Sequence, residues 1–331
     1  MLHKHPLAAA LFTLLIVGLL GIVLFRVSDA PSSQKEADGG KSAAREAGAI
    51  RREGERGATT PVPSLSIHLQ QLLGDDSNMA GKMRIAWVGK HGADLEENEV
   101  ETILAFLHSG RVPAGLSEGE WYWLVDELFT ALRAGTGSPQ KLTGQLAELF
   151  ADTALDLVVR DYALQHLGHL GGEGGDLETI RAAAATGLEE TATPIAGTAL
   201  LVLHNDPGGS AVEGDRTAAA APNGPNDTGA PAQTRDPGLL ALGLLGNEQA
   251  SVASKVTAFQ VAARHKAAGT RSAAVAALGG DAPLLLRFAA VAALGEVGTP
   301  ADLPLLQSLP ADNKRLQQAV ESAMRKLTSS N

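Results

Sequence analysis

The sequence contains no cysteine, few aromatic residues and only one long uncharged apolar run. Without cysteine the chain cannot form disulfides, cysteine-ligated zinc sites or a thiol nucleophile, and its redox compartment is left open. Aromatic residues make up 4% of the chain, and runs of Val, Ile, Tyr and Thr are nearly absent, whereas Ala, Leu and other strong helix formers abound. This imbalance predicts an all-α fold.

Basic charge is also scarce beyond the N-terminal part of the chain. The formal net charge of the 331 residues is −10. Residues 1–60 carry eight Lys/Arg and six Asp/Glu, so the remaining 271 residues hold 19 basic and 31 acidic groups. A domain with this acidic excess lacks the basic surface that nucleic-acid binding requires, so we expect no nucleic-acid partner.

The one long apolar run covers residues 7–25, LAAALFTLLIVGLLGIVLF, and contains no charge. At a rise of ~1.5 Å per residue it is just long enough to cross a hydrocarbon core of ~30 Å. The alternative, a cleaved signal peptide, usually has a shorter apolar region, and the only small-x-small site, residues 28–30, precedes a proline. We therefore expect a single-pass membrane protein held by a transmembrane signal anchor. A short tail at 1–6 favours a periplasmic or otherwise extracytoplasmic location for the rest.

Two polar stretches divide the remaining chain. Residues 26–64 have almost no apolar side chain larger than Ala after the first few positions and predict a disordered tether. The run at 51–56 holds three Arg; it could touch anionic lipid, but a solvated linker is the simpler interpretation. Residues 205–237, rich in Gly, Pro, Asn and Ala, predict a disordered insertion within a helical domain that spans 65–328.

A motif recurs through this domain. Val159–Gly168 (VRDYALQHLG) aligns with Leu286–Gly295 (LRFAAVAALG). The positions equivalent to the motif Arg are 125, 160, 196, 255, 287 and 317, with spacings of 35, 36, 59, 32 and 30. The outlying spacing contains the polar insertion, which explains its length. Further helices are expected between the motif helices, at Gln140–Ala151, Leu177–Leu188, Leu239–Glu248, Thr270–Leu278 and Ala301–Leu309.

These features predict repeats of two antiparallel helices, the motif helix first and the second stacked against it. Asp156, Asp176 and Asp302 precede helical stretches as N-cap candidates. Gly168 and Gly295 fall near predicted helix ends, where a left-handed residue is commonly needed.

The residues VRDYALQHLG and LRFAAVAALGEVGTPADLPLLQSL resemble HEAT repeats, members of the armadillo-type α-solenoid class, and in particular the short bacterial kind found in phycobilisome-lyase-like proteins. The resemblance covers about 120–328. It implies a right-handed α-solenoid whose second helices line a concave face, and protein binding rather than catalysis. It also implies that Arg160 and Arg287 bond within or between repeats, although positions 196 and 317 are Ala and Gln.

Candidate chemical groups are sparse. His166 and His169 have a spacing that could hold a metal, but no third histidine is near, so we expect no metal and no cofactor. Residues 171–176 (GGEGGD) lack the Lys-Ser/Thr of a phosphate-binding loop and predict an inter-helix turn. No nucleophile-base arrangement is evident, so we expect no enzyme activity.

Trp121 and Trp123 are less easily dismissed as core residues. On a helix they point ~200° apart, so one buried face cannot hold both. Either the helix at 118–134 is sandwiched between neighbours, or one tryptophan anchors a partner. We expect a membrane-anchored scaffold that binds another protein. An accessory lyase-like or small-molecule-binding protein is the alternative.

Overall fold

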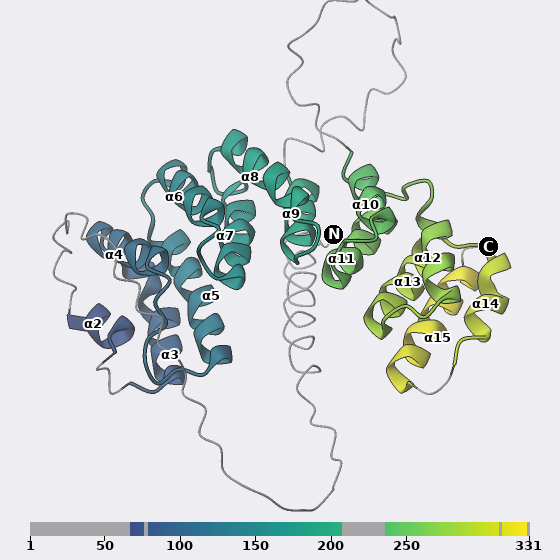
Figure 1. The fold of residues 1–331 in the computed structure, drawn as a ribbon, viewed down its shortest axis with the longest axis horizontal. Coiled ribbons are helices and arrows are strands. Elements are labelled where there is room, and N and C mark those ends of the chain that lie inside the picture. Colours follow the sequence, from purple (N-terminus) through teal and green to yellow (C-terminus); the bar gives the residue numbers. More distant parts are fainter. Residues whose placement is uncertain (1–66, 76–78, 207–235, 311–312, 330–331) are drawn as a thin grey trace, which may run out of the picture. The chain divides into compact units, whose positions relative to one another are not determined.

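In a computed structural model of the chain, residues 67–75, 79–206, 236–310 and 313–329 are described. Throughout these residues the regular secondary structure is helical, with no β-strand, which confirms the all-α prediction (Figure 1). The first elements are α2 (Ile67–Leu73), α3 (Gly81–His91), η1 (Gly92–Asp94), α4 (Glu97–His108), α5 (Glu118–Gly135), α6 (Pro139–Ala151), α7 (Leu157–Leu170), α8 (Leu177–Glu189) and α9 (Ile195–His204). After the gap come α10 (Pro237–Gly246), α11 (Val252–Arg264), α12 (Thr270–Gly279), α13 (Leu284–Val297), η3 (Pro300–Asp302), α14 (Leu303–Gln307) and α15 (Lys314–Ser329).

Side-chain caps fix the start of several helices. The Asp156 carboxylate accepts a hydrogen bond from the Val158 N–H at α7, and Asp176 caps α8 in the same way, as predicted. Asp302 does not cap α14; it lies at the end of η3, where its carboxylate accepts from the Thr299 N–H and from Arg271. The predicted helix over 301–309 is accordingly split into η3 and the five-residue α14.

Helices pack in neighbouring pairs, but the pairing differs from the prediction. Each of the motif helices α7, α9, α11 and α13 packs far more extensively on the helix that precedes it in the sequence than on the helix that follows it. The pairs are therefore α6 with α7, α8 with α9, α10 with α11 and α12 with α13, and the motif helix is the second of its pair, not the first. The sequence pattern alternates regularly, and this alternation does not say which neighbour a helix pairs with.

The motif helices also contact one another in succession, from α5 through α7, α9, α11 and α13 to α15. Small residues permit this close approach. A Cβ built on Gly168 would lie 2.8 Å from Val202 Cγ2 of α9, and one built on Gly295 would lie 3.1 Å from the Ala323 Cα of α15. Neither glycine has a positive φ, so the expected left-handed role was wrong: both are needed for contact between helices.

The buried apolar residues form clusters that follow one another along the chain. One extends from Leu69 to Val202, a second from Ala196 to Ala262, and a third from Val256 to Leu327, and their sequence ranges overlap. Each cluster thus joins helices that are near neighbours in sequence, as expected for repeated helix pairs.

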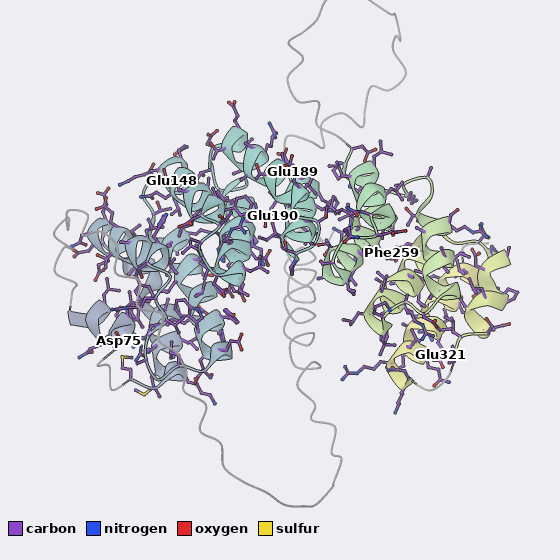
Figure 2. All side chains as sticks on the ribbon, viewed as in Figure 1. Asp75, Glu148, Glu189, Glu190, Phe259 and Glu321 are labelled. Atoms are coloured by element: carbon purple, nitrogen blue, oxygen red, sulfur yellow. The ribbon has the colours of Figure 1, made fainter. Side chains whose placement is uncertain are left out.

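Arg160 confirms the structural role expected of the motif arginine. Its Nε donates to the Phe150 carbonyl at 2.8 Å, and its two terminal nitrogens bond Glu190 at 3.1 and 2.5 Å. Arg160 thereby links α7 to both α6 and the end of α8, where Glu190 is labelled in Figure 2. The sister residue Arg287 is half-buried, and its Nε is buried without a hydrogen-bond partner.

Several predicted segments lie outside the described residues: the tail at 1–6, the transmembrane anchor at 7–25, the tether at 26–64 and most of the insertion at 205–237. Within the described part of the chain, no helix is both long and apolar enough to cross a membrane. The range predicted for the insertion, 205–237, is too long at both ends. Asp206 is buried and paired with Arg181, while Asp236 caps α10 and Pro237 begins it.

Candidate interaction surface

The two candidate tryptophans lie in different environments on α5. Trp121 is 5% exposed and meets Phe106 of α4 edge-on, with ring centroids 6.0 Å apart. Trp123 is 56% exposed. α5 is packed between α3, α4, α6 and α7, but these neighbours bury Trp121 and leave Trp123 open, so packing between neighbours does not account for both tryptophans.

Two carboxylates follow Trp123 one helical turn later. Asp126 and Glu127 stand three and four residues on, which places them on the same face of α5. The Trp123 indole N–H hydrogen-bonds the Glu127 carboxylate. Burial, and after it the Asp126 charge, raise the pKa of Glu127 above its ordinary value. Glu127 and Asp126 thus repel each other beside the exposed indole.

The neighbouring helix α7 contributes Tyr162, which packs against the core, and Asp161; both are partly buried. Burial, and after it the Asp126 and Asp161 charges, raise the pKa of Tyr162 to about 12. Asp161 accepts a hydrogen bond from Gln165 at 3.1 Å. Burial raises the pKa of Asp161, and hydrogen bonds from Thr198 and Gln165 oppose that rise. The partners of Asp161 are thus neutral groups, not cations.

We call Trp123, Asp126, Glu127, Asp161 and Tyr162 together the Trp123 face. Sequence reasoning found only the tryptophan in it. The spacing from position 123 to 126 and 127 was a usable signal, since residues three and four apart share a helix face. Asp161 and Tyr162 could not be assigned to the same surface before the contact between α5 and α7 was known.

His166 of α7 lies behind this face and joins α5 to α7. It is 4% exposed, stacks on Phe129 and places Nε2 3.3 Å from Asp126 Oδ1. Arg133 Nη1 lies 3.3 Å from Nδ1, and because Arg can only donate, Nδ1 accepts and Nε2 carries the proton. Burial lowers the pKa of His166, in keeping with a neutral ring.

His169 is one turn from His166, with ring centroids 5.9 Å apart. Among the described residues, no group of three or more potential metal ligands comes together. The predicted turn at 171–176 is confirmed: it connects α7 to α8, and Gly174 adopts a φ of +90° that favours glycine.

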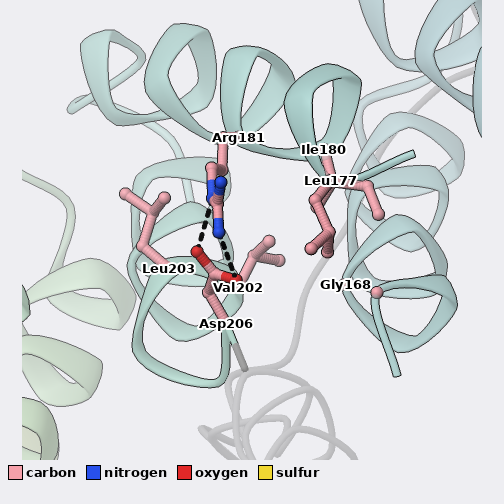
Figure 3. A pocket seen from close by; sticks show the side chains of 8 residues that line it. Gly168, Leu177, Ile180, Arg181, Val202, Leu203 and Asp206 are labelled. Carbon is pink, nitrogen blue, oxygen red and sulfur yellow. Dashed lines mark hydrogen bonds and ion pairs between the residues drawn. The ribbon is translucent and has the colours of Figure 1, made fainter. Parts of the chain in front are cut away.

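A small pocket lies between α7, α8 and α9 (Figure 3). Arg181 and Asp206 form a bidentate pair across it, with bonds of 2.6 and 3.1 Å, and Leu177, Ile180 and Val202 line the apolar side. Its cavity volume of about 10 Å³ is far below the ~300–1,000 Å³ of most ligand pockets. Because the Arg181 guanidinium is already paired with the Asp206 carboxylate, it is not available to bind an anionic ligand in this pocket.

No known protein family, curated protein or solved structure matches the chain. The resemblance to HEAT repeats thus depends on the motif residues alone.

Proposed function

We propose that this chain is a membrane-anchored protein whose helical domain is a HEAT-like α-solenoid that acts as a non-catalytic scaffold for another protein. The exposed Trp123 is the observation that carries the proposal. A tryptophan left 56% exposed costs solvation free energy, and tryptophan is enriched at the centres of protein interfaces.

The helical architecture supports a scaffold. Paired helices that contact only their neighbours present extended surfaces, and this is how repeat proteins bind their partners.

The membrane location in this proposal is inferred from the sequence alone. Residues 7–25 serve as the anchor, residues 26–64 as the tether, and the helical domain lies on the extracytoplasmic side. A tether of this length lets the domain reach partners that are not adjacent to its anchor.

Site-specific photocrosslinking tests the proposal. A photoreactive phenylalanine analogue replaces Trp123 in the full chain, expressed in its native membrane. The matched control carries the analogue at Glu148, an exposed residue of α6 labelled in Figure 2. We expect a discrete crosslinked protein from position 123 and none from position 148. No crosslinked protein from position 123, or the same products from both positions, contradicts the proposal.

A further inference from the structure

The Trp123 face combines an exposed aromatic ring with three carboxylates from two adjacent helices. Trp123, Asp126 and Glu127 come from α5, and Asp161 and Tyr162 come from α7. Trp123 and the 44% exposed side chain of Asp126 give a partner direct access to this face.

The negative charge of this face is not neutralised within the described residues. Among these residues no Lys or Arg forms an ion pair with Asp126, Glu127 or Asp161. Asp126 meets His166, whose buried ring is neutral.

The cationic side chains near this face interact with other groups or are not paired with its carboxylates. Arg133 pairs with Glu173 and donates to His166, and Lys82 of α3 acts on Glu120 rather than on Glu127. Lys90 of α3 is exposed and forms no ion pair with Asp126, Glu127 or Asp161. The hydrogen-bond partners of these carboxylates are thus neutral groups, and their negative charge can attract an external cation.

We propose that the Trp123 face binds a cationic, arginine- or lysine-rich segment of the partner protein. A guanidinium or ammonium group can stack on the indole while it donates hydrogen bonds to Asp126 or Glu127. Asp161 on α7, whose hydrogen-bond partners are neutral, favours the same cation. An acidic segment or a phosphate-rich surface would be repelled at this place. This inference rests on the proposed function and names the chemistry of the partner.

A peptide titration tests the charge of the partner. The full chain is held in nanodiscs of zwitterionic phosphatidylcholine, so that lipid does not attract the probe. Fluorescently labelled peptides of nine arginines, and of nine alternating glycines and serines, are then titrated and followed by anisotropy. We expect binding of the arginine peptide alone, weakened by added salt.

Variants locate the binding. Trp123→Ala and Glu127→Gln should each weaken the arginine peptide about five- to tenfold, because each removes one of the few direct contacts with the cation. Glu148→Gln on α6 and Leu239→Ala on α10 should change the affinity for the arginine peptide less than twofold. The first control removes an exposed carboxylate and the second an exposed apolar side chain, both outside the Trp123 face. Circular dichroism of each variant confirms that the helices persist.

Three outcomes overturn the inference. One is absence of binding to the wild-type chain, and a second is equal weakening by Glu127→Gln and Glu148→Gln, which would indicate diffuse attraction to an acidic protein. The third is binding that appears only after Arg51, Arg52 and Arg56 are replaced by Ser, which would make the chain's own basic run the occupant. If photocrosslinking at position 123 captures a partner whose binding resists salt and the Glu127 change, the scaffold proposal stands and the cationic partner fails.

Discussion

The close contact between α9 and α11 yields a prediction in which the same substitution has opposite effects at two sites. Gly197 lies in the first turn of α9 against Ser254 of α11. A Cβ at Gly197 would stand 3.0 Å from the Ser254 Cα and 3.2 Å from the Thr257 hydroxyl oxygen. Because the first of these atoms is backbone, α11 would have to move. Gly144 in the middle of α6 is the control, since a Cβ there meets nothing within 4 Å.

The magnitudes follow from two opposing terms. Replacing a helical glycine by alanine stabilises by about 0.5–1 kcal/mol through the reduced entropy of the unfolded chain. Forcing a methyl group into a close helix contact costs about 1–3 kcal/mol. Gly144→Ala should therefore raise the free energy of unfolding by about 0.5–1 kcal/mol. Gly197→Ala combines both terms and should lower it by about 1 kcal/mol net, and by no more than about 2.5 kcal/mol.

Urea unfolding followed by far-ultraviolet circular dichroism measures both changes. For a domain of this size about 1 kcal/mol corresponds to a melting shift of about 2–4 °C, which thermal unfolding resolves. If Gly197→Ala stabilises as much as Gly144→Ala, then α9 and α11 do not approach as closely as the structure shows. That result would refute the assignment of small residues to helix contacts.

Three further predictions test other parts of the fold. Arg160→Met leaves Glu190 without its cation and should cost about 2–4 kcal/mol in urea unfolding; if the variant is no less stable than the wild type, the linking role of Arg160 is wrong. Leu294→Asp places a charge at a 0% exposed position and should melt the C-terminal helices, seen as lost helicity; full helicity would contradict the burial. Burial lowers the folded-state pKa values of His169 and His204 to about 4, whereas a histidine in the unfolded chain has a pKa of ~6.5. As the pH drops, the unfolded state therefore binds protons before the folded state does. The free energy of unfolding should consequently fall between about pH 6.5 and pH 4. Replacing both histidines with glutamine should flatten this decline, and an unchanged decline would assign it to other groups.

The helices were predictable because their signals are local. The expected ranges 140–151, 177–188 and 270–278 agree with α6, α8 and α12 to within one or two residues. Helix pairing was not predictable, because it depends on how each turn directs the chain, and connections of similar length occur on both sides of α7 and α11. The Gly168 interpretation failed for a related reason. A glycine near a helix end serves equally well as a terminator and as a contact point, and only the neighbouring helix decides.

The candidate surface shows the same limit. Helix geometry established that Trp121 and Trp123 face apart, and this prediction holds. It could not say which ring is buried, since that depends on Phe106 of α4 rather than on α5 itself. Assigning Asp161 and Tyr162 of α7 to the surface of Trp123 requires knowledge of a contact between residues about 35–40 positions apart, which no local pattern encodes.

The long spacing of 59 between motif positions now has a structural account. Gly197 N–H bonds Ser254 Oγ, and Ser251 and Ser254 donate to the Thr193 carbonyl, across sequence separations of 57, 58 and 61. Elsewhere the side-chain links between neighbouring helix pairs span fewer residues, such as 30 from Arg160, 31 from Arg271 and 40 from Arg133. The helix pairs before and after the gap are therefore direct neighbours, and the extra residues fall between two pairs rather than inside one. Because the closure cost of a connection grows only with the logarithm of its length, doubling the separation costs about 0.6 kcal/mol, which the contacts between α9 and α11 readily exceed.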